Sequence, residues 1–205
     1  VDAERQDPLS KIFADFERAG YVWPESIQYS SGVSDRVLYV VSLLRRQTPS
    51  IPLPSGFSAV PRSLLRLRDF RFPNGEYVRF GDGPRRSSPP YASLELAYGL
   101  ARREGDDAGV QEFGGILREA MESGRLDRGR LGGPLSGAEV YLAPLALLWQ
   151  EPEILVPPAS RPAPSTTDIM PFAGLVVQRN LAPDGAADDG LMAAVSGAAY
   201  VHSHA

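Results

Sequence analysis

The C-terminal stretch "YVHSHA" contains the only two histidines of the sequence, His202 and His204. Imidazole groups can bind a metal ion or transfer a proton near neutral pH. Side chains at i and i+2 of a strand point to one face, about 6.5–7 Å apart. This spacing is a moderate signal for zinc, but zinc needs three or four ligands. A plain polar face of a strand is therefore an equal alternative.

A second group of reactive side chains lies in "FPNGEYVRFGDGPRR", residues 72–86, where Tyr77 is followed by Arg79, Arg85 and Arg86. Positive charge beside a tyrosine stabilises its phenolate. Such a tyrosine can act as a general base or general acid. The alternative is an exposed loop that carries arginine without a catalytic role.

The third group lies in "YVWPESIQYS", where Pro24 interrupts a helix and presents Trp23, Glu25 and Tyr29. Aromatic faces stack on sugar rings, and a carboxylate can hydrogen-bond to sugar hydroxyls, so the group suits carbohydrate binding. The alternative is that Trp23 belongs to the core and Glu25 is a favourable charge at a helix N-terminus.

Composition narrows the classes of function. The chain has 205 residues, of which 43% are hydrophobic and 22% charged, which suits one or two globular domains. The net charge of −4 argues against nucleic acid as the main partner. No run approaches the roughly 18 apolar residues of a membrane span, so no membrane partner is expected. The absence of cysteine excludes disulfides and thiolate metal sites. Lys11 is the only lysine among 21 basic residues, which reflects a GC-rich genome or the suitability of guanidinium for binding carboxylates and sulfates.

Helices are predicted through most of the first 150 residues, from Pro and Gly positions and apolar spacing. The expected stretches are "DPLSKIFADFERAG", "VSDRVLYVVSLLRRQ", "VPRSLLRLRDF", "YASLELAYGLARREG", "DAGVQEFGGILREAMESG" and a helix within "SGAEVYLAPLALLWQ" kinked by Pro144. A break is predicted at "RFPNGEYVRFGDGPRRSSPP", which is rich in Gly, Pro, Asn and Asp. The second helix is expected to start at an N-cap, Ser34, and to be largely buried because its apolar face is wide.

The pattern changes at the proline-rich "VPPASRPAPSTTD", which is predicted to be an extended linker. After it, "AGLVVQRN" and "LMAAVSGAAYVHSHA" are predicted strands, and "APDGAADDG" is a predicted turn or loop. A helix is the alternative for the Ala-rich last stretch. Two strands do not make a stable domain. Because the chain also lacks an initiator Met and stops in a predicted strand, we expect a fragment of a longer protein.

The order of these stretches resembles the heparinase II/III-like polysaccharide lyases, a family that includes related alginate lyases. The matching segments are "WPES" with Tyr29 after it, "FPNGEYVRFGD", "PFAGLVVQRN" and "DGLMAAVSGAAYVHSHA". The resemblance implies an α+β multidomain fold, the end of an incomplete (α/α) toroid followed by the first strands of an antiparallel β-sandwich. The implied domains are 1–155 for the toroid, 156–168 for the linker and 169–205 for the sandwich.

The resemblance also implies roles for individual residues. Tyr77 corresponds to the catalytic tyrosine, Glu25 to a toroid carboxylate and His202 to a histidine that the sandwich contributes to the cleft. His204 corresponds to the first ligand of a structural zinc, the one cofactor expected, if any. The family's toroid histidine is expected just before Glu25, where this sequence has Gly-Tyr-Val-Trp at 20–23.

The implied reaction is β-elimination at the 4-O-glycosidic bond of a uronic acid in an acidic polysaccharide or oligosaccharide. Trp23, Tyr29 and the three arginines of residues 72–86 would bind the substrate, and a bacterial periplasmic or secreted location is expected. A non-catalytic binder of acidic glycans on the same scaffold is one alternative, favoured by the missing histidine. A metal-dependent hydrolase that uses the HxH pair is the other.

Overall fold

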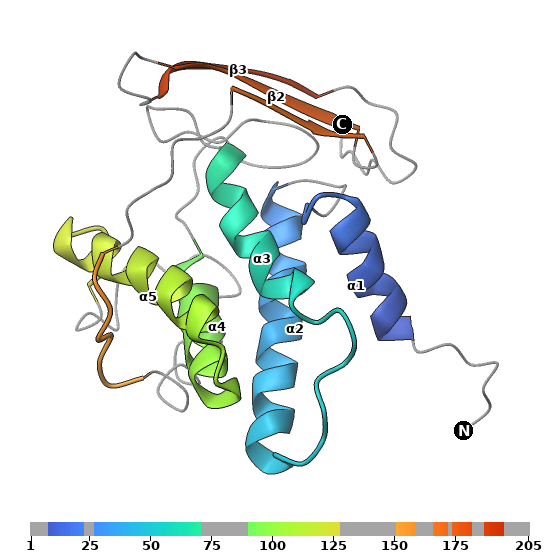
Figure 1. Ribbon diagram of the computed structural model, residues 1–205, viewed down its shortest axis with the longest axis vertical. Helices are drawn as coiled ribbons and strands as arrows, with labels where there is room; N and C mark the ends of the chain where they lie inside the picture. Colours follow the sequence, from blue (N-terminus) through green and yellow to red (C-terminus); the bar gives the residue numbers. More distant parts are fainter. Residues whose placement is uncertain are drawn as a thin grey trace. The chain divides into compact units, whose positions relative to one another are not determined.

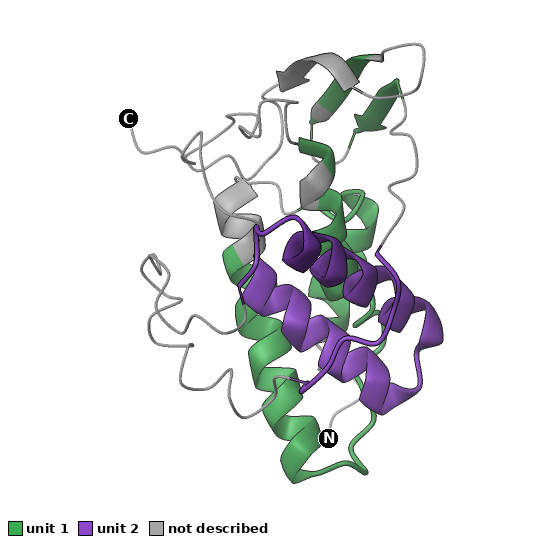
Figure 2. Ribbon diagram, turned by 90° about the vertical axis from the view of Figure 1, so that its left-hand side faces the viewer, with its two compact units in different colours: residues 1–89, 162–205 green, residues 90–161 purple. Residues whose placement is uncertain are grey.

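The chain forms two compact units, residues 1–89 with 162–205, and residues 90–161 (Figure 2). In this computed structural model the described residues are 8–22, 27–70, 90–127, 151–158, 166–171, 174–181 and 187–194. The predicted toroid and sandwich, with their domain bounds, stay predictions. Within the described ranges no helix has the length and apolar character needed to cross a membrane.

The first unit contains a group of helices that share one apolar core (Figure 1). Its helices are α1 (Pro8–Arg18), α2 (Ile27–Gln47), α3 (Ala59–Arg66) and the 3-10 helix η1 (Leu67–Phe70). Helix α3 packs against both α1 and α2. The Phe13 and Phe57 rings meet edge to face with centroids 5.8 Å apart, a favourable geometry for two aromatic rings. Buried aromatic and aliphatic side chains thus hold α3 against its two neighbours.

Helix α1 confirms the prediction of a helix between Pro8 and Gly20. Its C-terminus closes with a pair of backbone bonds, Tyr21 N to Phe16 O at 2.7 Å and Gly20 N to Glu17 O at 3.0 Å. This is a Schellman motif, which requires a left-handed residue after the helix. Gly20 supplies it with φ +70°. Its Cα also lies close to β1, since an added Cβ would sit 3.0 Å from Met170 Cγ.

Helix α2 differs from the sequence-based expectation in two ways. It begins at Ile27, so Ser34 lies inside the helix rather than at its N-cap. The Ser34 side chain is fully buried, and its hydroxyl hydrogen-bonds to that of Ser63 in α3. The expectation of a largely buried helix is also wrong. Leu38 is buried, whereas Val40 and Leu44 are each 51% exposed, because only one face packs on the helical core.

The first unit also contains a three-stranded antiparallel sheet in the order β1-β2-β3. The strands are β1 (Thr167–Met170), β2 (Leu175–Leu181) and β3 (Ala187–Ala194). Strand β2 confirms the prediction from "AGLVVQRN", and β3 begins inside the predicted loop "APDGAADDG". Strand β1 was not predicted, because "TDIM" follows a proline-rich stretch and gains its strand character from pairing with β2, Ile169 opposite Val176. Residues 195–205 of the predicted last strand lie outside the described residues.

The second unit is built on a pair of packed helices, α4 (Tyr91–Glu104) and α5 (Asp107–Glu122), both as predicted. Gly105 ends α4 with φ +70°, and the Asp106 side chain caps α5 by accepting a bond from Gly109 N at 3.0 Å. The two helices approach each other closely at Gly114, where an added Cβ would lie 2.7 Å from Tyr98 Cε2 of α4. The predicted helix within 136–150, with Pro144, lies outside the described residues.

Candidate functional site

Most residues of the predicted site fall outside the described part of the chain. These are Trp23, Glu25, Tyr77, Arg79, Arg85, Arg86, His202 and His204. Tyr29 lies in the first turn of α2, where the backbone alone is described. The structure therefore neither brings these residues together nor separates them. It does describe the residues that directly precede the segments 23–26 and 71–89. A group of polar side chains lies at each of these two places.

The first polar group is a pair formed by Tyr21 and Arg62, which flanks the segment that begins at Trp23. Arg62 Nη1 donates a hydrogen bond to the Tyr21 hydroxyl at 3.2 Å. The Arg62 Cζ atom also lies 5.6 Å from the centroid of the Tyr21 ring, within the range of a cation–π contact. Arg62 is exposed and Tyr21 is half-buried. An exposed guanidinium is thus held in place by one phenol.

The backbone at Tyr21 is unusual. Its φ of +64° makes Tyr21 the only non-glycine with positive φ among the described residues. A left-handed conformation costs a residue with a Cβ about 1–2 kcal/mol. The hydrogen bond from Tyr21 N to Phe16 O and the contact with Arg62 help to hold this conformation. The turn leads the chain into Val22, which is fully buried and directly precedes Trp23.

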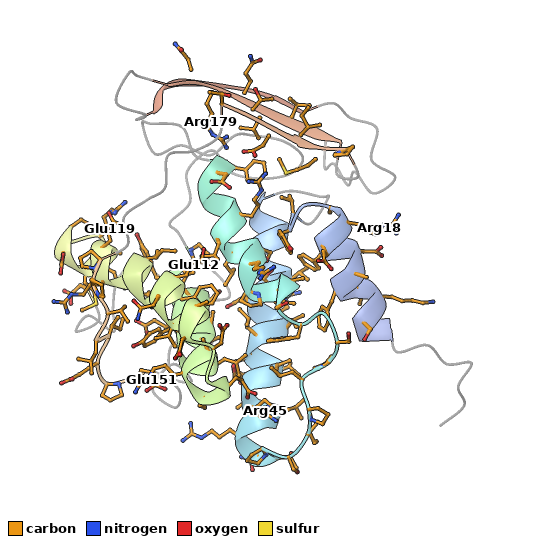
Figure 3. All side chains as sticks on the ribbon, viewed as in Figure 1. Arg18, Arg45, Glu112, Glu119, Glu151 and Arg179 are labelled. Atoms are coloured by element: carbon orange, nitrogen blue, oxygen red, sulfur yellow. The ribbon has the colours of Figure 1, made fainter. Side chains whose placement is uncertain are left out.

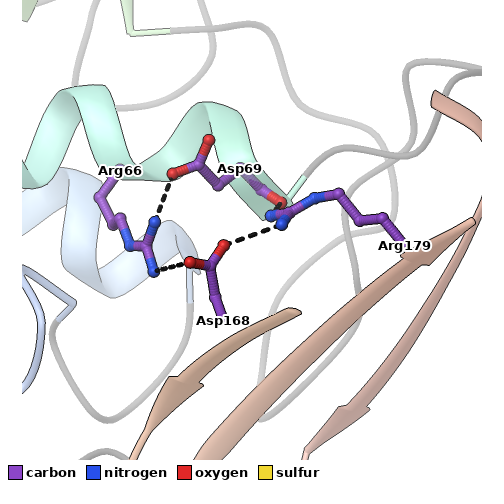
Figure 4. Close-up of polar contacts among 4 residues, drawn as sticks. All are labelled: Arg66, Asp69, Asp168 and Arg179. Atoms are coloured by element: carbon purple, nitrogen blue, oxygen red, sulfur yellow. Dashed lines mark hydrogen bonds and ion pairs between the residues drawn. The ribbon is translucent and has the colours of Figure 1, made fainter. Parts of the chain in front are cut away.

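The second polar group joins the helices to the sheet and consists of Arg66, Asp69, Asp168 and Arg179 (Figure 4). Arg66 Nη1 lies 2.6 Å from Asp69 Oδ2, and its Nη2 lies 3.4 Å from Asp168 Oδ1. Arg179 Nη1 lies 2.8 Å from Asp168 Oδ2, and its Nη2 donates to the Asp69 carbonyl at 2.8 Å. The two cations and two carboxylates compensate each other within one network.

Arg179 is the most buried member of this network, with 6% of its side chain exposed. It projects from β2 toward the end of η1 and joins residues 110 positions apart in the sequence (Figure 3). A buried cation needs partners for its charge and its donors, and here both are provided. The network therefore attaches the sheet to η1 just before residue 71. We assign it a structural role, since its charges are already paired.

The predicted zinc site cannot be built from the described side chains. Within those residues no group of three or more His, Asp or Glu side chains could hold a metal ion. The HxH pair lies outside them. Imidazole is a suitable zinc ligand, and His202 and His204 together could supply at most two of four ligands. The structural zinc at His204 stays a prediction.

Sequence reasoning missed both polar groups. Tyr21 and Arg62 are 41 positions apart, and Asp69 and Arg179 are 110 apart, so no local pattern connects them. The one available signal was the arginine spacing in "PRSLLRLRDF", where Arg62 and Arg66 share one face of a helix at i and i+4. That spacing places two guanidinium groups side by side but does not identify their partners.

Comparison with known proteins gives two matches. The model of a protein family described as the second domain of endo-acting ulvan lyases matches residues 19–161. An endo-acting ulvan lyase from Formosa agariphila is 25% identical over 184 residues, which is 89% of this chain and 22% of that lyase. No solved structure matches the chain significantly. These matches confirm the predicted resemblance to polysaccharide lyases, while the heparinase II/III-like subgroup stays a prediction.

Proposed function

The chain belongs to the family of the second domain of endo-acting ulvan lyases, and we propose that its protein cleaves a uronic-acid-containing polysaccharide by β-elimination. The observation that carries this proposal is the family match over residues 19–161. The 25% identity to an endo-acting ulvan lyase, over 89% of this chain, supports it. The chain spans about a fifth of that relative's length, so the activity proposed is that of the whole protein.

The proposed reaction breaks the bond between C4 and O4 of the uronic acid. A base removes the C5 proton, the electron pair forms a C4–C5 double bond, and an acid protonates the departing O4. The C5 proton is only weakly acidic until the neighbouring carboxylate is neutralised by a cation or a hydrogen-bond donor. The residues required are thus one acid/base group and a set of donors around the carboxylate.

The residue types of the chain suit these roles. In the proposal Tyr77 transfers the protons, with His202 as the second proton-transfer group. Glu25, when protonated, donates a hydrogen bond to the substrate carboxylate. The aromatic side chains Trp23 and Tyr29 stack on sugar rings, and three arginines of the segment 71–89 bind further carboxylates: Arg79, Arg85 and Arg86.

Architecture and substrate are proposals of the same kind. We propose that the helices belong to an incomplete (α/α) toroid and the sheet to a β-sandwich, as in the heparinase II/III-like lyases. Ulvan is the first polymer to test, because the Formosa relative is named an endo-acting ulvan lyase.

The decisive assay follows absorbance near 232 nm when the complete protein is incubated with ulvan and with other uronate polymers. Elimination creates a conjugated C4–C5 double bond that absorbs there, and hydrolysis does not. A rise in absorbance supports the lyase. New reducing ends without absorbance indicate a hydrolase, and binding without cleavage indicates a glycan-binding protein.

Tyr77→Phe tests the assignment of the acid/base group. We expect turnover to fall by roughly 10²-fold or more, because the variant loses a proton-transferring hydroxyl and little else. Tyr39→Phe, which removes a hydroxyl from α2, is the matched control and should keep wild-type turnover. If both variants keep the wild-type rate, another residue transfers the proton.

A further inference from the structure

We propose that Arg62 and Tyr21 form a binding subsite for the carboxylate of an acidic sugar. The identity of the ligand rests on the proposed function, whereas the subsite itself rests on the described side chains. Arg62 is held in one orientation by Tyr21 but has no acidic partner within the described residues.

Several of the described arginines pair with a carboxylate. The described arginines with an ion pair include Arg18, Arg66, Arg102, Arg118, Arg125 and Arg179. Arg62 lies one helical turn before Arg66, on the same face of α3. Arg66 lies between two carboxylates, those of Asp69 and Asp168. Within the described ranges Arg62 instead bonds to the Tyr21 phenol, which leaves its positive charge uncompensated.

The contacts with Tyr21 leave donors available for a ligand. The guanidinium group has five N–H donors, and one Nη1 hydrogen is used by the Tyr21 hydroxyl at 3.2 Å. The Nε and Nη2 edge can form two parallel bonds to one carboxylate, the geometry for which arginine is suited. The Tyr21 oxygen accepts the bond from Arg62, so its own proton can be donated to the same ligand.

The pair is also pre-organised for binding. The Tyr21 ring lies 5.6 Å from Arg62 Cζ, so the guanidinium is positioned by the ring as well as by the hydroxyl. A side chain that is already ordered loses less conformational freedom when a ligand binds. Tyr21 adopts its left-handed φ of +64° at this point, and strained backbone of this kind clusters at ligand sites.

The location fits a sugar polymer. Tyr21 lies two residues before Trp23, the aromatic residue proposed to stack on a sugar ring. A polymer that contacts Trp23 would have neighbouring sugar units within reach of the start of that segment. A uronate carboxylate is the anionic group that such a polymer carries on its ring.

The test measures binding of the complete protein to ulvan, and to ulvan whose carboxyl groups have been chemically reduced to alcohols. Affinity electrophoresis gives the Kd for each polymer. We expect Arg62→Gln to raise the Kd for ulvan about tenfold, as loss of hydrogen bonds to a charged group does. The Kd for the reduced polymer should stay within about twofold, because the lost bonds require a carboxylate.

Three further variants test the hydroxyl of Tyr21, the geometry of the guanidinium group and an unrelated arginine. Tyr21→Phe should raise the Kd for ulvan about threefold, since a neutral hydrogen bond is worth less. Arg62→Lys should fall between wild type and Arg62→Gln, because lysine keeps the charge and loses the fork. Arg36→Gln removes another exposed arginine, on α2, and should change neither Kd. Circular dichroism spectra establish that each variant is folded.

The outcomes separate the subsite from the proposed reaction. The subsite is refuted if Arg62→Gln has the wild-type Kd for ulvan, or if its Kd rises equally for ulvan and for the reduced polymer. This holds even where absorbance at 232 nm shows that the protein is an active lyase. A wild type that binds neither polymer also refutes it. If the wild type produces no absorbance at 232 nm but Arg62→Gln weakens binding to ulvan and not to the reduced polymer, the lyase proposal fails and the subsite stands.

Discussion

Replacing Arg179 by glutamine should destabilise the contact between the sheet and the helices of the first unit. Arg179 contributes a charge-assisted bond to Asp168 at 2.8 Å and a second bond to the Asp69 carbonyl at 2.8 Å. Its side chain is 6% exposed, so water cannot replace these bonds at little cost. Glutamine keeps polarity and part of the length but can neither carry the charge nor reach both partners.

The expected loss in free energy of unfolding depends on which interactions Asp168 keeps after Arg179 is replaced. Hydrogen bonds to charged groups contribute about 1.5–3 kcal/mol each, and breaking a fully buried ion pair costs about 3–5 kcal/mol. Asp168 keeps Arg66 at 3.4 Å, and 21% of its side chain is exposed, so its carboxylate is not left uncompensated. We therefore expect a loss of about 2–3 kcal/mol, or a Tm lower by about 5–10 °C.

The assay combines thermal unfolding with amide hydrogen exchange. Arg18→Gln is the matched control, because the Arg18–Asp15 pair has side chains 65% and 53% exposed and should contribute less than about 0.5 kcal/mol. In Arg179→Gln, exchange should accelerate in β1, in β2 and in residues 66–70. Equal Tm values for the two variants, or unchanged exchange in the strands, would refute the structural role of the network.

Other predictions concern a close helix contact and the histidines. Gly114→Ala should lower the free energy of unfolding by about 1–3 kcal/mol, since an added Cβ would lie 2.6 Å from Val156 Cγ2. The Cβ added by Gly32→Ala in α2 would have no neighbouring atom within 4 Å, so this control should raise the free energy of unfolding by about 0.5–1 kcal/mol. Equal Tm shifts for the two variants would contradict the packing argument. His204→Ala should lower zinc content and Tm together in the complete protein, whereas His202→Ala should mainly lower turnover. Elemental analysis that finds no stoichiometric zinc in the wild type would rule out this division.

Local sequence signals were sufficient to predict several helices and one strand. Pro8 and Gly20 enclose α1, and Gly105 separates α4 from α5, because the backbone sterics of proline and glycine act within a few residues. The apolar run of "GLVVQRN" was sufficient for β2 for a similar reason, since side-chain branching favours extended backbone. The resemblance to polysaccharide lyases also followed from the order of short motifs, and the family match agrees with it.

Tertiary structure decided which residues meet. Ser34 has the side chain of an N-cap, but burial against Ser63 places it inside α2. Strand β1 forms because it pairs with the edge of β2, and the sequence "TDIM" by itself does not predict this pairing. The partners of Arg62 and Arg179 lie 41 and 110 positions away. Contacts of that separation depend on how whole elements pack, whereas a sequence pattern reports only the preferences of neighbouring residues.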